Sequence, residues 1–483
     1  MWCWALFTLL YFSAVLASAF TKELWFDELV TLYVDRQPTL ADVWKALAGS
    51  ADAMPPLFHI LTRAAHGVIS NEAAATRFPA NVGYWVMCVA VWSFLRRRMP
   101  AVHAWTGVAA ALLPATFYYA TEGRSYGLTL GLAAVAMLLW QRAVEQDRRP
   151  IHVAGLAVAL CAAVCSHYYA VFLTIPVGLA ELYRTRHSGK RDWPVLLAAA
   201  SILIPLAAHQ PLIRAADVYR ADLWAAPTIL DGPRFYLELL AGIGPAITLA
   251  LIVGGVAVRF AGEFSQPSDA GLRPVELVFG MGLLAIPLAV LASAFLITHT
   301  YFPRYGMAAA IGLMVVSGEA SVRALGRRPT AAACFAGALF LALGIQRAHD
   351  VVSNWRNLPT APAMAAVAAA TRGPVVVEEA VTYLNVWHYS PAELRSRMTF
   401  VVDADAAMRE AKLGNPETSL QKLLPYAPLR LEKPEPFLRG HREFSLLVHP
   451  TRPSWMLREL TSRGATLEIR ERWPALWLLS VRQ

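Results

Sequence analysis

Two adjacent carboxylates, Asp27 and Glu28, come shortly after an uncharged run of membrane length, residues 2–20. Ionisable groups beside hydrocarbon are costly to hold, and in membrane proteins they tend to mark functional positions. A carboxylate placed there can take a proton from an acceptor hydroxyl or amine, or hold a divalent metal ion. Trp25, Phe26 and Leu29 surround the pair, which indicates that the loop presses these acids against the membrane face. Two solvated loop acids are the simpler interpretation.

A second polar segment, residues 118–126, reads Tyr-Tyr-Ala-Thr-Glu-Gly-Arg-Ser-Tyr. Glu122 and Arg124 neutralise one another in the simplest interpretation. A third acid and a cation at the depth of Asp27 also predict a charged pocket at the membrane surface. In that pocket Glu122 would orient the acceptor or a metal, and Arg124 would face a phosphate, because guanidinium groups bind phosphate oxygens in bidentate fashion.

Other candidates lie at the ends of apolar runs. His59 follows a helix start at Pro55-Pro56, but it is a weak signal because no second histidine stands at metal-binding spacing. Arginine at headgroup level either snorkels or meets a phosphate, and aromatic belts explain interfacial tyrosines without any function. The remaining candidates are Arg77 before a span, Tyr126 in the second segment, His167 and Tyr168 in a Ser-His-Tyr-Tyr turn, and Arg304 and Tyr305 after a late span.

The composition is that of an integral membrane protein. Hydrophobic residues make up 57% of the chain, charged residues 16%, and the mean hydropathy is +0.43. The net charge of +9 comes from short basic clusters between apolar runs, which indicates topology signals and no nucleic-acid partner. All five cysteines lie inside apolar runs, a setting that suits neither a disulfide framework nor a thiolate metal site.

The apolar runs predict a polytopic α-helical membrane protein with about eleven transmembrane helices. With the amino terminus inside, the basic clusters fall on the cytoplasmic side and the polar motifs on the outer side. Ala17-Ser18-Ala19 resembles a signal-peptidase site, but the missing basic n-region and the charge alternation favour a retained first helix. The expected spans are residues 2–20, 78–95, 102–119, 125–140, 151–166, 169–183, 193–208, 237–258, 275–297, 306–322 and 330–345.

Two further regions carry structure outside these spans. The first outer loop, residues 21–76, has the spacing of amphipathic helices lying in the interface plane. After the last span the pattern changes to strands at 374–379, 398–402, 444–448 and 467–481, with helical pieces at 391–397 and 454–462. The chain therefore divides into a transmembrane catalytic domain, residues 1–346, and a small C-terminal α/β extracytoplasmic domain, residues 347–483.

The order of these motifs resembles the GT-C superfamily of membrane glycosyltransferases. It is most similar to the bacterial branch related to protein O-mannosyltransferases and to the aminoarabinose transferases that modify lipid A, which is a glycosyltransferase family 39-like pattern. The resemblance covers residues 2–322 and is carried by an Asp-Glu pair after the first span, a Pro-Pro-Leu helix start, an Arg-Phe-Pro entry, a Glu-x-Arg-x-Tyr turn, a His-Tyr-Tyr turn and an Arg-Tyr after a late span.

The resemblance implies an inverting transferase that uses a polyprenyl-phosphate sugar donor on the extracytoplasmic side of the bacterial inner membrane. The acceptor would be a lipid, a glycan or a protein, although the chain has no Trp-Trp-Asp acceptor motif and its terminal domain is not a β-trefoil. Metal dependence stays open, with Asp27 and Glu122 as the ligands if a divalent metal takes part. By position, the catalytic residues are Asp27, Glu28 and Glu122, the donor phosphate contacts are Arg77, Arg124, Arg304 and Tyr305, and the acceptor or sugar pocket holds His59, Tyr126, His167 and Tyr168.

Two other classes of function compete with this interpretation. A secondary transporter or lipid flippase carries ionisable residues near mid-span and paired broken helices, whereas the polar motifs here gather at outer ends. The second class is a non-catalytic scaffold that presents the terminal domain to the cell envelope. Such a protein would not need the polar motifs at the outer ends.

Overall fold

A computed structural model of the chain describes residues 2–145, 148–222, 225–261, 270–356, 360–411, 414–473 and 476–483. By contacts between residues, the chain divides into two compact units. The first unit contains residues 1–22, 54–210 and 225–356, and the second contains residues 23–53, 211–224 and 357–483. This division differs from the expected boundary after residue 346, because most of the first loop and a short internal segment cluster with the C-terminal region.

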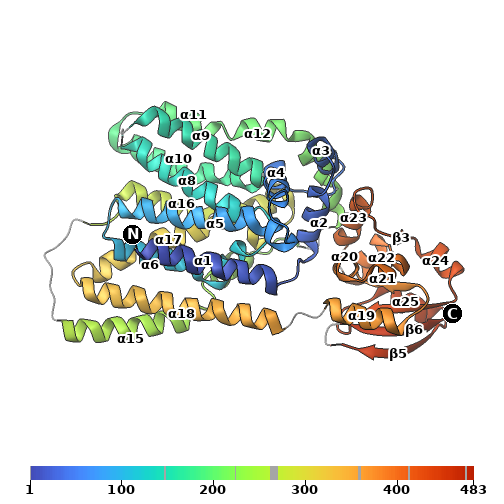
Figure 1. Ribbon diagram of the computed structural model, residues 1–483. Helices are drawn as coiled ribbons and strands as arrows, with labels where there is room; N and C mark the ends of the chain where they lie inside the picture. The colour runs from blue at the N-terminus through green and yellow to red at the C-terminus, as the bar shows by residue number, and fades with distance from the viewer. Residues whose placement is uncertain are drawn as a thin grey trace. The chain divides into compact units, whose positions relative to one another are not determined.

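The first unit is a helical bundle (Figure 1). Its α-helices are α1 (Trp2–Thr21), α4 (Pro56–His66), α5 (Glu72–Arg96), α6 (Ala101–Ala109), α7 (Pro114–Phe117), α8 (Tyr126–Val144), α9 (Arg149–Ser166), α10 (Thr174–Ser188), α11 (Trp193–Ala200), α12 (Leu203–Ala208), α14 (Asp231–Leu239), α15 (Ile243–Ala261), α16 (Pro274–Ser293), α17 (Ala309–Leu325) and α18 (Pro329–Arg356). Short 3₁₀ or π segments join them at η1 (Ala110–Leu112), η2 (Tyr118–Ala120), η3 (Tyr168–Leu173), η5 (Ala294–Thr298) and η6 (Pro303–Gly306).

Among the described residues, six helices are long and apolar enough to cross a membrane, or up to eight if each of two bent pairs counts as one span. The expected run 102–119 is divided among α6, η1, α7 and η2, with Pro114 at the start of α7. The run 169–183 begins as a 3₁₀ turn before α10. Hydropathy finds apolar stretches but not helix breaks, so the count of eleven spans stays a prediction.

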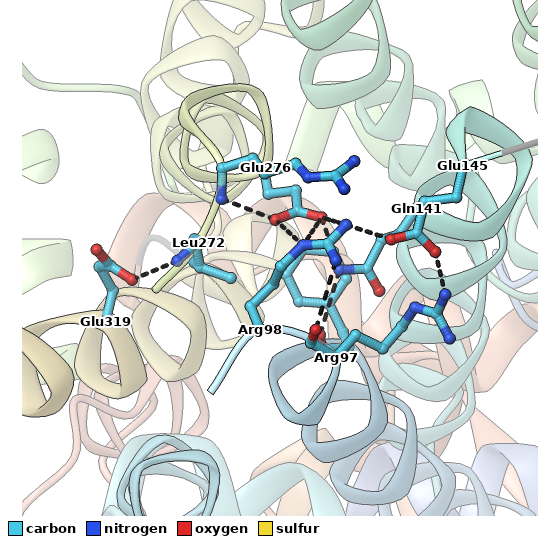
Figure 2. A network of polar contacts seen from close by, with 9 residues as sticks. Arg97, Arg98, Gln141, Glu145, Leu272, Glu276 and Glu319 are labelled. Carbon is cyan, nitrogen blue, oxygen red and sulfur yellow. Dashed lines mark hydrogen bonds and ion pairs between the residues drawn. The ribbon is translucent and has the colours of Figure 1, made fainter. Parts of the chain in front are cut away.

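Polar contacts join four helices at one end of this bundle (Figure 2). Arg98, just beyond α5, lies between Glu145 at the end of α8 and Glu276 in the first turn of α16. Its Nε donates to both Glu276 oxygens at 2.9 Å, and Gln141 of α8 donates to the same carboxylate at 2.8 Å. In α17, Glu319 accepts from the backbone N–H of Leu272 at 2.8 Å. The network fixes the ends of these helices relative to one another.

The second unit combines helices with a six-stranded sheet (Figure 1). Its helices are α2 (Phe26–Asp35), α3 (Leu40–Ala48), α13 (Gln210–Ala215, except its first residue), η4 (Ala216–Asp222), α19 (Thr360–Ala370), α20 (Ala380–Tyr389), α21 (Ala392–Arg397), α22 (Ala404–Ala411), α23 (Asn415–Leu423), α24 (Pro434–Gly440) and α25 (Trp455–Ser462). The strands are β1 (Val375–Val377), β2 (Met398–Val401), β3 (Leu431–Glu432), β4 (Glu443–Val448), β5 (Thr466–Arg472) and β6 (Trp477–Arg482).

The sheet has the order β3-β2-β1-β4-β6-β5. The first four strands are parallel, with Val375 opposite Met398 on one side and Ser445 on the other. Strands β4, β6 and β5 are antiparallel. Every residue of β1 and β2 is buried, which is typical of parallel strands covered on both faces. Strands or helices occupy the positions expected after residue 346, but the single run expected at 467–481 is divided into β5 and β6, and β3 was not expected.

Side-chain contacts tie the first-loop segment to the C-terminal region inside this unit. The Tyr389 hydroxyl accepts from the backbone N–H of Leu24 at 2.7 Å, and the Tyr33 hydroxyl lies 2.8 Å from Nδ1 of His388. Gln37 donates to the carbonyl of Tyr426 at 2.9 Å. Because hydrophobic residues of α2 such as Leu29 and Leu32 are also buried, this helix is part of a core and not a tether.

Candidate active site

The two acids that follow α1 begin helix α2 in the second unit, and the local fold gives them different surroundings. Glu28 is fully buried, and its Oε2 accepts from the backbone N–H of Trp25 at 3.1 Å, which satisfies a donor left open by the first helical turn. Asp27 is half-buried in the same turn. The adjacent carboxylates are therefore not equivalent, since Glu28 has a structural contact that stabilises the helix start.

In the first unit, the segment before α8 buries its charged residues. Glu122 is 1% exposed and Arg124 is 7% exposed. The Tyr118 hydroxyl donates to Oε1 of Glu122, and the ammonium of Lys22, at the end of α1, lies 5.0 Å from the Tyr118 ring centroid. Buried ionised groups are costly unless they have a partner or bind a charged ligand, so this turn is built to hold charge.

His167, just after α9, lies within the electrostatic influence of two of the predicted arginines. Burial and the positive charges of Arg304 and Arg124 lower the pKa of His167 to about 3. The ring is 3% exposed, and within the described part of the chain its Nδ1 has no hydrogen-bond partner. Arg124, His167 and Arg304 are more than 40 residues apart in sequence. The fold brings the two arginines close enough for their charges to affect the histidine.

Aromatic rings surround the same histidine. The ring centroids of Tyr126 and Tyr305 lie 5.5 and 5.3 Å from that of His167, and Tyr169 stacks on Tyr305 at 4.2 Å. The guanidinium of Arg304 lies 5.9 Å from the Tyr305 ring and 4.7 Å from that of Phe302. Arg124, Tyr126, His167, Arg304 and Tyr305 thus form one group, which we call the arginine–histidine cluster.

The cluster lies at helix ends. Tyr126 is the first residue of α8, His167 follows the last residue of α9, and Arg304 belongs to the turn before α17. The polar network of Figure 2 joins the opposite ends of α8 and α17.

Three other predicted residues have different surroundings. Arg77 is fully buried in α5, and its Nη1 donates to the carbonyls of Lys22 at 2.9 Å and Ser18 at 3.4 Å, so it caps the end of α1. His59 is buried in α4. The Tyr168 ring lies 6.0 Å from that of His209.

Sequence reasoning missed two contributors, Tyr118 and Tyr169. Both stand inside segments that it singled out, but an interfacial tyrosine is explained equally well by an aromatic belt. Their contacts with Glu122 and Tyr305 become visible only in the fold. Among the described residues, no group of three or more His, Cys, Asp or Glu side chains is arranged to hold a metal ion.

Comparisons with known proteins show which family model and which solved structures this chain is similar to. The sequence model of the dolichyl-phosphate-mannose-protein mannosyltransferase family matches residues 53–210. The crystal structure of ArnT from Cupriavidus metallidurans in the apo state is similar over 99% of this chain and 98% of that chain, with a TM-score of 0.60 and 12% sequence identity. ArnT bound to undecaprenyl phosphate is similar over 99% and 97%, with a TM-score of 0.60 and 13% identity. No curated protein matches the sequence.

The match to the family model and the likeness to ArnT confirm the resemblance that the order of motifs predicted. The chain has the fold of a GT-C membrane glycosyltransferase.

Proposed function

We propose that this protein is an inverting glycosyltransferase that moves a sugar from a polyprenyl-phosphate donor to an acceptor outside the bacterial cytoplasmic membrane. The proposal rests chiefly on the arginine–histidine cluster, in which two arginines act on one buried, uncharged histidine. Burial is the larger cause of the lowered pKa of His167, and the positive charges of Arg304 and Arg124, which add to it, are the part of the site that would attract an anion. The chain is similar in fold to ArnT bound to undecaprenyl phosphate, which supports a lipid phosphate as that anion.

In the proposed reaction, the carboxylate of Asp27 accepts the proton of the acceptor hydroxyl or amine. The acceptor atom bonds to the anomeric carbon from the face opposite the phosphate, and the bond between that carbon and the phosphate oxygen breaks. The electron pair leaves on polyprenyl phosphate, which therefore needs no proton. Arg124 and Arg304 stabilise the charge that develops on the leaving group, because fixed cations do so better than mobile water.

The other residues serve this reaction in supporting roles. Glu122, held by the Tyr118 hydroxyl, orients the acceptor. The rings of Tyr126 and Tyr305 border the sugar, with His167 as a neutral hydrogen-bonding group. Glu28 accepts from the backbone N–H of Trp25 at the start of α2, the helix that carries Asp27, and Arg77 donates to a backbone carbonyl at the end of α1.

A transporter is less well supported. Its ionisable residues would lie near the middle of the spans, whereas the cluster occupies the ends of α8, α9 and α17.

The first prediction concerns Asp27. Reconstituted protein is incubated with a panel of polyprenyl-phosphate sugars and with lipid, glycan and protein acceptors, and the released lipid phosphate is measured. We expect release with at least one donor, and a loss of about 100-fold or more in Asp27→Asn, the usual size of a general-base effect. Asp405→Asn, which changes an exposed carboxylate of the same unit, is the matched control and should keep full activity.

Asp27→Asn and Asp405→Asn each remove one carboxylate from the first turn of a helix, so both should lower the melting temperature by a similar, small amount. Full transfer by Asp27→Asn would remove this residue from the base role. Failure of every donor with the wild-type protein would contradict the proposed reaction itself.

A further inference from the structure

A groove of about 510 Å³ lies in the second unit, among residues of α22, α24 and α25. Each of these helices follows a parallel strand, since α22 comes after β2, α24 after β3 and α25 after β4. Asp403 and Lys433, which line the groove, stand two residues and one residue beyond the ends of β2 and β3. The groove therefore lies at the carboxyl edge of the parallel strands, which is where open α/β sheets bind ligands.

The carboxylates that line the groove already have partners. Glu410 pairs with Arg458 at 2.6 Å, Glu459 pairs with Arg463 at 2.7 Å, and Glu435 pairs with Arg463 and with Arg439 at 3.3 Å. Oδ1 of Asp403 accepts from the backbone N–H of Ala406 at 2.8 Å. Arg439, Arg458 and Arg463 thus balance the charges of the three glutamates, and Asp403 contributes one further negative charge to the groove.

Two more cations line the same groove. Arg409 of α22 and Lys433 before α24 are exposed, and neither has an ion pair or side-chain hydrogen bond within the described residues. Trp455, at the start of α25, adds a neutral donor. It is only 9% exposed, and its indole Nε1–H has no hydrogen-bond partner among the described residues. A buried donor without a partner costs free energy that a ligand oxygen would recover.

We propose that this groove binds a small ligand carrying an oxyanion, either phosphoryl or carboxylate, through Arg409, Lys433 and the indole N–H of Trp455. Guanidinium and ammonium groups supply charge-assisted hydrogen bonds to such oxygens. The inference is independent of sugar transfer, because all of its residues belong to the second unit and none belongs to the arginine–histidine cluster.

The test measures binding by titration calorimetry on the full chain in neutral detergent. The protein carries Arg304→Ala, so that phosphate binding at the cluster does not contribute. The probes are inorganic phosphate, glucose 1-phosphate, glucuronate and neutral glucose. We expect binding of the anions but not of glucose, and comparison of phosphate with glucuronate identifies the preferred oxyanion.

Variants assign the binding to the groove. Arg409→Ala with Lys433→Ala should weaken anion binding at least tenfold, and Trp455→Phe, which keeps the ring but removes the N–H, should weaken it several-fold. The matched control is Arg372→Ala with Arg442→Ala, which removes the same charge just before β1 and β4, at the amino edge of the sheet. Absence of anion binding, or an equal loss in the control pair, would overturn the proposal.

Discussion

At the scale of single residues, the sequence neighbours Asp27 and Glu28 have different surroundings and different roles. Glu28 accepts the Trp25 N–H and is fully buried, while Asp27, one residue earlier, is half-buried. Arg77 and Arg304 both stand at the ends of spans, yet the Nη1 of Arg77 donates to backbone carbonyls at the end of α1, and Arg304 acts on His167. Residue type and position alone do not distinguish these roles.

Sequence reasoning nevertheless selected Arg124, Tyr126, His167, Arg304 and Tyr305, which the fold gathers into one group. They could be found because charged or imidazole groups at helix ends stand out against apolar runs. The roles of Glu28 and Arg77 as helix caps could not, because these depend on which backbone groups approach the side chain in three dimensions.

Glu378, at the end of β1, gives a pH-dependent prediction. Burial, with the nearby charge of Glu379, raises the pKa of Glu378 to about 8 from an ordinary value of 4.5. Between these two values the folded protein keeps a proton that the unfolded chain releases, so the free energy of unfolding falls as pH rises from about 4.5 to 8. We expect Glu378→Gln to reduce this fall in melting temperature, measured from pH 5 to 8.5.

The control is Glu468→Gln, a surface change on β5 that should leave the wild-type slope. If Glu378→Gln keeps that slope as well, the side chain does not hold its proton over this pH range.

At the scale of elements, the position of the cluster depends on how closely α5 and α8 pack. A Cβ added at Gly131 of α8 would lie 2.3 Å from the carbonyl oxygen of Gly83 in α5, and one at Gly83 would lie 2.4 Å from Cα of Leu128. These are backbone atoms, which cannot move aside as a side chain can. The absence of side chains at both glycines brings the two helices into backbone contact.

We expect Gly131→Ala to lower the melting temperature and the transfer activity. In a helix, alanine is normally favoured over glycine by about 1 kcal/mol, but overpacking costs about 1–3 kcal/mol, and shifting α8 would displace Tyr126. Gly178→Ala in α10 is the control, because its Cβ would meet nothing within 4 Å and should be neutral or slightly stabilising. Thermal unfolding in detergent checks both, and equal melting temperatures would refute the close-packing account.

The sequence predicted which elements exist better than where helices break. Alternation and apolar runs located β1, β2 and β4, because strand periodicity is local, whereas the single run expected at 467–481 is divided into β5 and β6. The two residues of β3 are too few to carry a pattern. Apolar content likewise located the run 102–119 but not its division at Pro114, because hydropathy is averaged over a window.

At the scale of the whole molecule, three segments far apart in sequence make one unit. Ser50 donates to the carbonyl of Ala215 at 2.7 Å, and Tyr219 donates to the carbonyl of Ser50. The first-loop segment, the internal segment and the C-terminal region therefore belong to one compact unit. No local sequence pattern predicts this shared core, because it depends on contacts between distant segments.

The proposed function requires the arginine–histidine cluster to bind the donor's phosphate, and direct binding of a polyprenyl phosphate tests this most directly. Charge-assisted hydrogen bonds contribute about 1.5–3 kcal/mol, so Arg124→Ala with Arg304→Ala should weaken binding at least about tenfold. The control, Arg186→Ala with Arg259→Ala, removes equal charge from the exposed ends of α10 and α15 and should bind like the wild type. Unchanged affinity in the Arg124 and Arg304 variant would contradict the account.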